Sequence, residues 1–506
     1  MDPLFLNNSC DPFSSRELPC LTGAYVQYAV NVSEPRHVLE TINFVKRQNI
    51  RFVVKNTGHD YMGRSTGTGA VSVWMHHLRN ITWEPQFTSS NYNGPAFKAS
   101  AGVRGIDLVL EANKRGLVVV VGDCPTVGIA GGYTQGGGHS PLSSLHGLAA
   151  DQALEYEVIT TQGRFVVASR TQNQDLYWAL SGGGGGTYGI VWSVTVKAYP
   201  DLPVTIATLQ FNATGISQEL YWKAVEAYQS STPKYTDAKA WILTSYTNES
   251  FSLNPFFAIN KSPAQVETLI QPLLQSLDSL GIDYTSSIRP FNTYLEAYSD
   301  FLLHLPGFNI LLGSRVLTRS IWNDEATLAE LVDIIKGIVD GGAAAFDLAM
   351  RPTLEVAGYP KNSVHPAWRD SEKLFVFSMY VCFPFSPGLS SILIVTYALR
   401  SVIDDGESVE QMQANLKRIN SLEAALKRFT PGSVAYMNEA NVGDPDFKEA
   451  FYGTRYRSLL AIKRKWDPDH VLYGSTSVGG DEWREMDDGR LCRTNAMVVE
   501  SNQIVL

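Results

Sequence analysis

The stretch that decides the fold is the glycine-rich segment Gly122-Asp-Cys-Pro-Thr-Val-Gly-Ile-Ala-Gly-Gly-Tyr-Thr-Gln-Gly-Gly-Gly-His-Ser140. It follows Leu117-Val-Val-Val-Val121, whose β-branched content predicts a buried strand. Its glycines leave side chains nearly absent where they would obstruct a planar ligand, so its backbone can approach such a ligand closely. Cys124 stands at the exit of the predicted strand, where backbone dipoles would stabilise a thiolate. The plainer interpretation of Cys124 is a buried structural thiol beside a flexible loop.

A second loop follows an earlier predicted strand, Ile50 to Lys55. It reads Lys55-Asn-Thr-Gly-His-Asp-Tyr-Met-Gly-Arg-Ser-Thr-Gly67, and Gly58 and Gly63 allow its backbone to lie close to a ligand. Exposed amides in a turn after a strand form an anion-binding nest, which suits a pyrophosphate. The alternative is a surface loop that contains one ordinary histidine.

A third glycine-rich run, Ser181 to Gly189, leads into a predicted strand and not into a helix. The dinucleotide fingerprint of the doubly wound fold is therefore not met. The chain also lacks a phosphate-binding P-loop, an H-E-x-x-H motif and a closely spaced Cys/His cluster for zinc. Ser140 is not framed by G-x-S-x-G, and 63-GRSTG-67 fits those letters without lying on a predicted strand-to-helix turn, which a nucleophile elbow requires. These absences disfavour phosphate transfer, metalloprotease chemistry and serine hydrolysis.

The chain divides into three regions. Residues 1–200 alternate short strands, turns and helices, and Tyr199-Pro-Asp-Leu-Pro203 marks a boundary. Residues 201–430 combine strands with long amphipathic helices, and the tail from Pro431 is rich in Gly and Tyr. The expected helices are 36–48, 106–116, 175–180, 265–280, 324–340, 409–429 and 456–466; further expected strands are 153–160, 164–168, 190–196, 205–211 and 240–247.

Composition narrows the class of protein. The 506 residues carry a net charge of −9 without a long basic block, which disfavours nucleic-acid binding. No segment reaches 18 consecutive apolar residues, so no membrane span is expected. The first residues do not read as a signal peptide, but glycosylation triplets favour a secreted chain. They begin at Asn7, Asn31, Asn80, Asn212, Asn248 and Asn260. Cys10 and Cys20 are a plausible disulfide pair in an oxidising compartment.

Taken together, the motifs resemble one family. They are 58-GHD-60 with 63-GRS-65, 124-CPTVG-128 with 136-GGG-138, 147-GLAAD-151, 175-DLYWALSGGGG-185, 436-YMN-438, Tyr452-Gly453 and 463-KRKWDP-468. The chain resembles berberine-bridge-enzyme-like FAD-linked oxidases, fungal branch, of the vanillyl-alcohol oxidase superfamily. The resemblance implies an α+β fold. It has a two-subdomain PCMH-type FAD-binding domain (1–200) and a substrate domain (201–430) with an antiparallel sheet covered by helices. A berberine-bridge-type segment (431–506) returns to the FAD domain.

The resemblance also implies how FAD is held. The family histidine that bonds the flavin 8α-methyl group matches His59, and the cysteine that bonds flavin C6 matches Cys124, so attachment is expected to be bicovalent. An alkylated imidazolium places positive charge beside the ring and favours the anionic reduced flavin. Further contacts are expected from Asn56, Thr57, Gly58, Asp60, Gly63, Pro125, Thr126, Val127, Gly131, Gly132, Gly137, Gly189, Ile190 and Asn438.

Two residues are expected to be catalytic. Tyr436 matches the tyrosine of the family's Tyr-x-Asn signature and would act as, or assist, the base that removes a substrate hydroxyl proton. A phenol needs a positive neighbour for this near neutral pH. His139 stands where many members have Tyr or Phe, and it is either a proton acceptor, a substrate partner or a satisfied core histidine. The stretch Asn362–Arg369 either borders the substrate pocket or is a plain loop.

The expected activity is that of an FAD oxidase. Hydride passes from a small organic substrate, an alcohol or specialised metabolite, to the flavin and then to O2, which gives H2O2. An aromatic or polycyclic substrate is favoured by the aromatic content of 22 Phe, 23 Tyr and 10 Trp. It is also favoured by His139, which stands where many family members have Tyr or Phe. The alternatives are an oxidative cyclase, a carbohydrate oxidase and a non-redox flavin-binding protein. The expected protein is a secreted monomer whose partners are substrate and O2, with no metal, nucleic acid or membrane.

Overall fold

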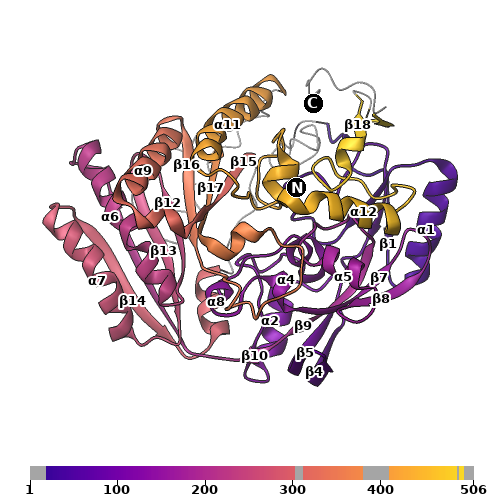
Figure 1. Ribbon diagram of the computed structural model, residues 1–506, viewed down its shortest axis with the longest axis horizontal. Helices are drawn as coiled ribbons and strands as arrows, with labels where there is room; N and C mark the ends of the chain where they lie inside the picture. The colour runs from indigo at the N-terminus through magenta and orange to yellow at the C-terminus, as the bar shows by residue number, and fades with distance from the viewer. Residues whose placement is uncertain (1–16, 18, 303–310, 380–408, 487–488, 495–506) are drawn as a thin grey trace.

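The computed structural model describes residues 17, 19–302, 311–379, 409–486 and 489–494. An N-terminal unit of two small sheets lies on one side of the molecule, and a large sheet covered by helices lies on the other (Figure 1). The C-terminal segment, which includes α12 (Tyr456–Trp466), packs back on the N-terminal unit. The predicted partner of Cys20, Cys10, lies outside the described residues, so that disulfide stays a prediction.

A three-stranded parallel sheet begins the N-terminal unit. Its order is β1 (Tyr28–Asn31), β3 (Val71–Trp74), β2 (Phe52–Lys55), and α1 (Pro35–Gln48) covers it. Val38, Ile42 and Val45 recur at helical spacing and are all buried. Leu472 of the C-terminal segment forms a parallel bridge with Phe52. The start of β2, three residues before the loop that begins at Lys55, is therefore held by β3 on one side and by Leu472 on the other.

A five-stranded antiparallel sheet completes this unit. Its order is β4 (Ile81–Ser89), β5 (Tyr92–Ser100), β9 (Ile190–Lys197), β7 (Ala153–Ile159), β8 (Phe165–Ser169). Shorter elements are α2 (Gly105–Asn113), α3 (Ser143–His146), α4 (Ala149–Gln152) and α5 (Gln174–Leu180). The predicted strand 117–121 is shorter in the structure: only β6 (Leu117–Val118) pairs, with β10 (Tyr199–Pro200). Val119, Val120 and Val121 are buried without ladder pairing, because a valine run packs equally well as an extended core segment.

The second unit is built on a seven-stranded antiparallel sheet. The order is β14 (Tyr284–Phe291), β11 (Val204–Asn212), β13 (Ser250–Ile259), β12 (Trp241–Tyr246), β16 (Ala343–Ala349), β17 (Ser371–Met379), β15 (Leu311–Thr318). Its helices are α6 (Gln218–Asp237), α7 (Pro263–Ser279), α8 (Tyr294–Leu302), α9 (Glu325–Asp340) and α11 (Val409–Phe429). Helices α6, α7, α9 and α11 form the outer layer (Figure 1).

Strand β17 shows how this sheet separates two cores. Phe375 and Phe377 belong to the core cluster beneath the outer helices. Leu374 and Val376, on the opposite face, belong to the cluster shared with the N-terminal unit. Because side chains alternate along a strand, one sheet serves both cores.

The junctions between the regions fall between elements. β10 ends at Pro200 and β11 begins at Val204, while α11 ends at Phe429. The division into three domains stays a prediction. The short hairpin of β18 (Trp483–Glu485) and β19 (Leu491–Arg493) lies near the end of the described chain.

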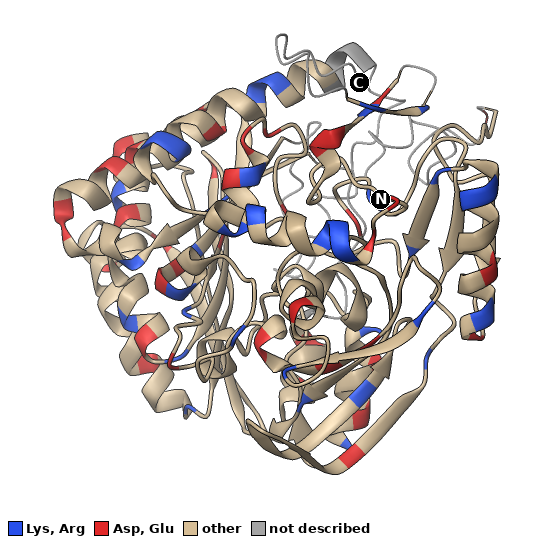
Figure 2. Cartoon of the chain, turned by 45° about the vertical axis from the view of Figure 1, so that its right-hand side comes forward, with Lys and Arg blue, Asp and Glu red and all other residues tan. Residues whose placement is uncertain are grey.

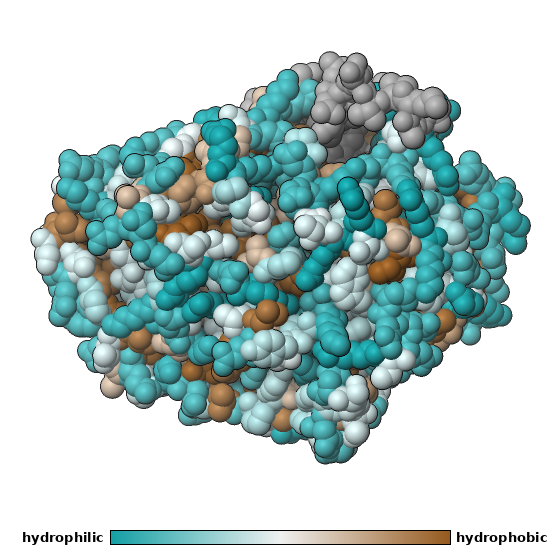
Figure 3. All heavy atoms as spheres, viewed as in Figure 1, coloured by the Kyte–Doolittle hydropathy of each residue, from teal (hydrophilic) through white to brown (hydrophobic). Residues whose placement is uncertain are grey.

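The surface shows mixed character. Acidic and basic residues are interspersed along the outer helices (Figure 2). On the face shown in Figure 3, apolar residues form small, separated patches among hydrophilic ones. Among the described residues, no helix is long and apolar enough to cross a membrane.

Candidate active site

The loop after β2 is shaped by one carboxylate. Asp60 accepts the backbone N–H groups of Met62 (3.2 Å), Ser65 (3.0 Å) and Arg64. Gly58 has a φ of +87°, a conformation that glycine adopts without strain. Within the described chain, the N–H groups of Thr57, Gly58 and His59 donate to no protein acceptor. The Asp60 side chain thus holds the loop, and adjacent free amides provide the predicted anion nest.

His59 and Cys124 meet at one hydroxyl group. The Nε2 atom of His59 lies 2.6 Å from Oγ1 of Thr126, and Sγ of Cys124 lies 3.7 Å from the same oxygen. The two side chains, 65 residues apart in sequence, therefore converge. Partial burial lowers the pKa of His59, although part of its surface is exposed to solvent, so the neutral imidazole prevails near neutral pH.

Cys124 differs from the sequence expectation of a stabilised thiolate. It is a free cysteine, and burial raises the pKa of its thiol, with Asp123 and Glu439 adding to the effect. The expectation was wrong because it counted backbone dipoles alone. The loss of solvation outweighs them, and the carboxyl groups of Asp123, the preceding residue, and of the distant Glu439 add to it.

The glycine-rich segment lies directly against the loop after β2. A Cβ at Gly128 would stand 2.7 Å from Nδ2 of Asn56, and one at Gly131 would stand 3.4 Å from it. Asn56 Nδ2 donates to the carbonyl of Ala101, whereas its buried Oδ1 has no partner. The glycines are thus needed for close approach, and Asn56 offers a free acceptor beside them.

The turn that carries Cys124 is fixed by α2. The carbonyl of Pro125 accepts the N–H of Ile106, and the carbonyl of Val127 accepts the N–H of Gly105, both at 2.9 Å. These carbonyls occupy free donors of the helix N-terminus. Pro125 and Val127 therefore position the turn through their backbones.

Asn438 joins the C-terminal segment to both loops. Its Nδ2 atom donates to the carbonyl of Gly132 (2.8 Å) and to the hydroxyl of Tyr436 (2.9 Å). Arg64 donates to Oδ1 of Asn438 (3.3 Å) and to the carbonyl of Met437 (2.9 Å). Loops that are far apart in sequence are thereby held at one place.

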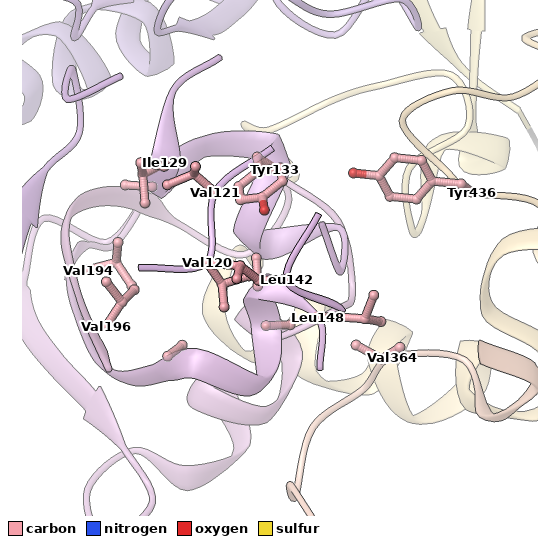
Figure 4. Close-up of a cluster of buried hydrophobic side chains, with 14 of the residues drawn as sticks. Val120, Val121, Ile129, Tyr133, Leu142, Leu148, Val194, Val196, Val364 and Tyr436 are labelled. Carbon is pink, nitrogen blue, oxygen red and sulfur yellow. The ribbon is translucent and has the colours of Figure 1, made fainter. Parts of the chain in front are cut away.

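Tyr436 is buried, and its hydroxyl is directed toward the glycine-rich segment that carries Tyr133 (Figure 4). Burial raises the pKa of Tyr436 far above its usual value, and the charge of Glu439 adds to this. The positive neighbour that a phenolate base would need is not among the main influences on the pKa of Tyr436. Since the hydroxyl already accepts a hydrogen bond from Asn438, a neutral phenol is left with its own O–H free to donate.

His139 contacts the carboxylate of Glu439, which the sequence did not predict. Its Nε2 atom lies 3.2 Å and 3.3 Å from the carboxylate oxygens of Glu439, and its ring packs edge-on to Tyr436 at 5.1 Å. Burial opposes a charge on His139, but Glu439 and Asp123 outweigh it and raise the pKa. If Nε2 carries the proton toward Glu439, the lone pair is on Nδ1, which is buried and has no partner.

The stretch Asn362–Arg369 links the two units. Arg369 forms a bidentate pair with the buried Asp151, both bonds at 2.8 Å, and Asn362 donates to the same carboxylate at 2.7 Å. Trp368 packs edge-on to Tyr436 at 5.7 Å. The stretch is therefore a structural connection that also supplies one wall beside Tyr436.

The remaining predicted residues can offer a ligand only their backbone atoms. Gly63 lies in the loop held by Asp60, with a φ of +70°. Gly137 has a φ of +109°, and its carbonyl accepts the N–H of Ala150 at 2.9 Å. Gly189 packs against Val158 of β7. Ile190 has its side chain in the core cluster beneath α1, so only its backbone can serve a ligand.

The structure gives four residues roles that the sequence analysis did not assign to them. Glu439 directly follows the Tyr436–Asn438 signature, and this position could have indicated that it belongs to the site. Thr126, Arg64 and Asp123 lie inside quoted motifs. Thr126 and Arg64 contact His59 and Asn438, which are distant in sequence, whereas Asp123 accepts the N–H of the adjacent Cys124. Among the described residues, no group of His, Cys, Asp or Glu could hold a metal ion.

Comparisons with known proteins agree with this geometry. A model described as "FAD binding domain" matches residues 26–169, and one described as "Berberine and berberine like" matches 435–479. FAD-linked oxidoreductase patO of Aspergillus clavatus is 42% identical over 96% of this chain and 81% of its own length. The chain belongs to the fungal VAO-type, berberine-bridge-enzyme-like family of FAD-linked oxidoreductases.

The chain is also similar to a VAO-type oxidase and to a solved VAO-type structure. VAO-type flavoprotein oxidase VAO615 of Thermothelomyces thermophilus is 38% identical over 97% of this chain and 82% of its own length. The crystal structure of the VAO-type flavoprotein MtVAO615 of Myceliophthora thermophila C1 superposes with a TM-score of 0.87 at 37% identity. It covers 97% of this chain and 86% of the solved chain. The predicted family and the α+β fold are confirmed, and the protein is an FAD-linked oxidoreductase.

The residues present fit FAD. The free amides of Thr57 to His59 and the unpartnered Oδ1 of Asn56 lie beside Gly128 and Gly131 of the glycine-rich segment. Such amides suit the pyrophosphate, and the glycines leave the backbone open to a flat ring. These are the residues of this VAO-type chain that can hold the cofactor.

Proposed function

We propose that the protein is an FAD oxidase with a flavin attached through both His59 and Cys124. The single observation that carries the proposal is the convergence of these two side chains on Thr126. A neutral His59 has a nitrogen lone pair available to form a bond, and its lowered pKa favours that form. The Thr126 hydroxyl orients both side chains. The resemblance assigns His59 to the 8α-methyl group and Cys124 to C6.

His139 is the proton acceptor in this proposal. Glu439 accepts the hydrogen bond of Nε2 and stabilises the imidazolium once Nδ1 has taken a proton, as a carboxylate does for a catalytic histidine. Tyr436 stays a neutral phenol and donates its O–H to the substrate oxygen. Of the alternatives that the sequence left open, this division gives the base role to His139 and the assisting role to Tyr436.

The bound flavin supplies the hydride acceptor and returns the electrons to O2, which yields H2O2. Oxygen is proposed as the final acceptor because the chain resembles oxidases and has no nicotinamide-binding motif. The substrate is an alcohol or a specialised metabolite, and it binds between the flavin site and the large sheet.

A panel of neutral aromatic and polycyclic alcohols tests the proposal. In air, a substrate should release one H2O2 for each molecule oxidised, measured by a peroxidase-coupled assay beside product analysis. A flavin that stays reduced in air would indicate a dehydrogenase. A flavin that no compound reduces would favour the non-redox alternative. A product with a new ring would indicate an oxidative cyclase.

Glu439→Gln should shift the pH dependence of kcat. A base must be deprotonated, so activity rises with pH through the pKa of His139, which Glu439 holds above its ordinary value of about 6.5. Without Glu439, burial prevails and the pKa falls, so the acidic limb should move to lower pH. The weaker base should lower the maximal kcat by roughly 10–100-fold. Glu219→Gln, in an exposed pair on α6, is the control, and an unmoved limb in Glu439→Gln would contradict the role of His139.

We also propose that the protein is a secreted, glycosylated monomer. The sequon residues Asn31, Asn80, Asn212 and Asn260 are exposed, which glycosylation requires, while Asn248 is half-buried and Asn7 lies outside the described residues. A mass shift on treatment with an endoglycosidase, together with the elution volume of the native protein, checks both points.

A further inference from the structure

The large sheet presents an uncharged surface to the N-terminal unit. On strands β15, β16 and β17, the side chains that face this unit include Leu312, Val316, Leu348, Leu374 and Val376, which share one core cluster with Tyr436. In the ranges 312–316, 344–348 and 374–378, the even-numbered residues face this unit, and none of them is charged. The charges of these strands, such as Asp347 and Lys373, alternate onto the helix-covered face.

Two hydroxyl groups interrupt this apolar surface. Ser314 and Ser378 are both 0% exposed, and neither Oγ has a hydrogen-bond partner. The register pairs Ser314 with Val376 and Ser378 with Leu312, so the two serines are diagonal neighbours on the inward face. Diagonal neighbours have their Cβ atoms about 7 Å apart. Buried polar groups are nearly always hydrogen-bonded. Ser72 shows that one unpartnered hydroxyl does not mark a site, so the observation that carries weight is that two of them are neighbours on one face.

The serines lie beside the catalytic segment. The N–H of Val316 donates to the carbonyl of Val434 at 2.7 Å. At the other end of the strand, Leu312 lines the same small cavity as Ala440. Ser314 stands between Leu312 and Val316 in β15. The stretch from Val434 to Ala440, which contains Tyr436 and Glu439, therefore runs beside it.

We propose that Ser314 and Ser378 bind two oxygen atoms of a neutral, mostly apolar substrate and orient it toward Tyr436 and His139. The proposal rests on the proposed function for the reaction but not for the binding. A charged substrate would lose its hydration against this surface without gaining a counter-charge. A sugar would leave most of its hydroxyls unpaired there. An aromatic or polycyclic compound with oxygens at opposite ends matches both the surface and the spacing.

Calorimetric titration of the flavin-loaded protein tests the binding without using turnover. The probes are a dihydroxynaphthalene with its hydroxyls at opposite ends, naphthalene itself, a naphthoate and a naphthylmethylammonium salt. The wild type should bind the diol more tightly than the other three. Ser314→Ala and Ser378→Ala should each weaken the diol by about tenfold and leave naphthalene unchanged. Ser72→Ala is the matched control, because Ser72 is another buried, unpartnered strand serine.

Each result decides the matter. The inference is overturned if the wild type binds no neutral probe, if a charged probe binds best, or if the two serine variants behave like Ser72→Ala. Peroxide release is measured separately on the same preparations. A protein that binds the diol through both serines but releases no peroxide would refute the proposed oxidase activity and leave this inference standing.

Discussion

Denatured wild-type protein will keep its yellow colour, and only the double variant His59→Ala/Cys124→Ala will release all of its flavin. Each single variant should keep the flavin through the remaining bond, because both side chains reach the same Thr126 hydroxyl and act on one ring edge. The measurement is acid precipitation followed by absorbance of the pellet and the supernatant, with the intact mass of each variant. A mass increase of one FAD is expected for the wild type and for both single variants.

The control is Cys492→Ala, since Cys492 is also a free cysteine but is exposed. Its flavin retention should equal that of the wild type. Release of all flavin from the wild type would disprove covalent attachment. Release from one single variant alone would show a single bond, to the residue that was replaced.

The fold could be predicted from the sequence wherever the signal was local. Helices such as α1 and α12 follow from apolar residues at helical spacing, and the loops after β2 and β6 follow from glycine beside a valine-rich run. The order of the seven-stranded sheet could not be read, because β15 and β17 pair across a long intervening stretch. That pairing places Ser314 and Ser378 on one face, which neither strand's own sequence indicates.

The site divides in the same way. His59, Cys124 and Tyr436 could be named because each lies in a compact motif. The ionisation of these groups could not, because it depends on burial and on carboxyl groups from other segments. Glu439 acts on His139 from 300 residues away and raises its pKa, while burial keeps both the Cys124 thiol and the Tyr436 phenol protonated.

Tyr436→Phe should lower kcat by about 10²–10³-fold while the flavin stays attached. The variant removes the only O–H that the phenol can donate to a substrate oxygen as charge develops there, and stabilising donors of this kind have effects of that size. Asn438 keeps its bond to the carbonyl of Gly132, so the loops should remain joined. Steady-state kinetics, together with the flavin absorbance spectrum, measure the effect.

The pH profile separates the two roles that the tyrosine could have. As a neutral donor with a strongly raised pKa, Tyr436 should not set any limb of the profile near neutral pH, so Tyr436→Phe should scale the curve down without changing its shape. If Tyr436 were the base, its replacement would instead remove the acidic limb. Tyr221→Phe is the matched control, because Tyr221 is buried and donates to the carbonyl of Thr247 at 2.8 Å in the second unit. That variant should keep the wild-type kcat, and an equal loss there would assign the effect to packing.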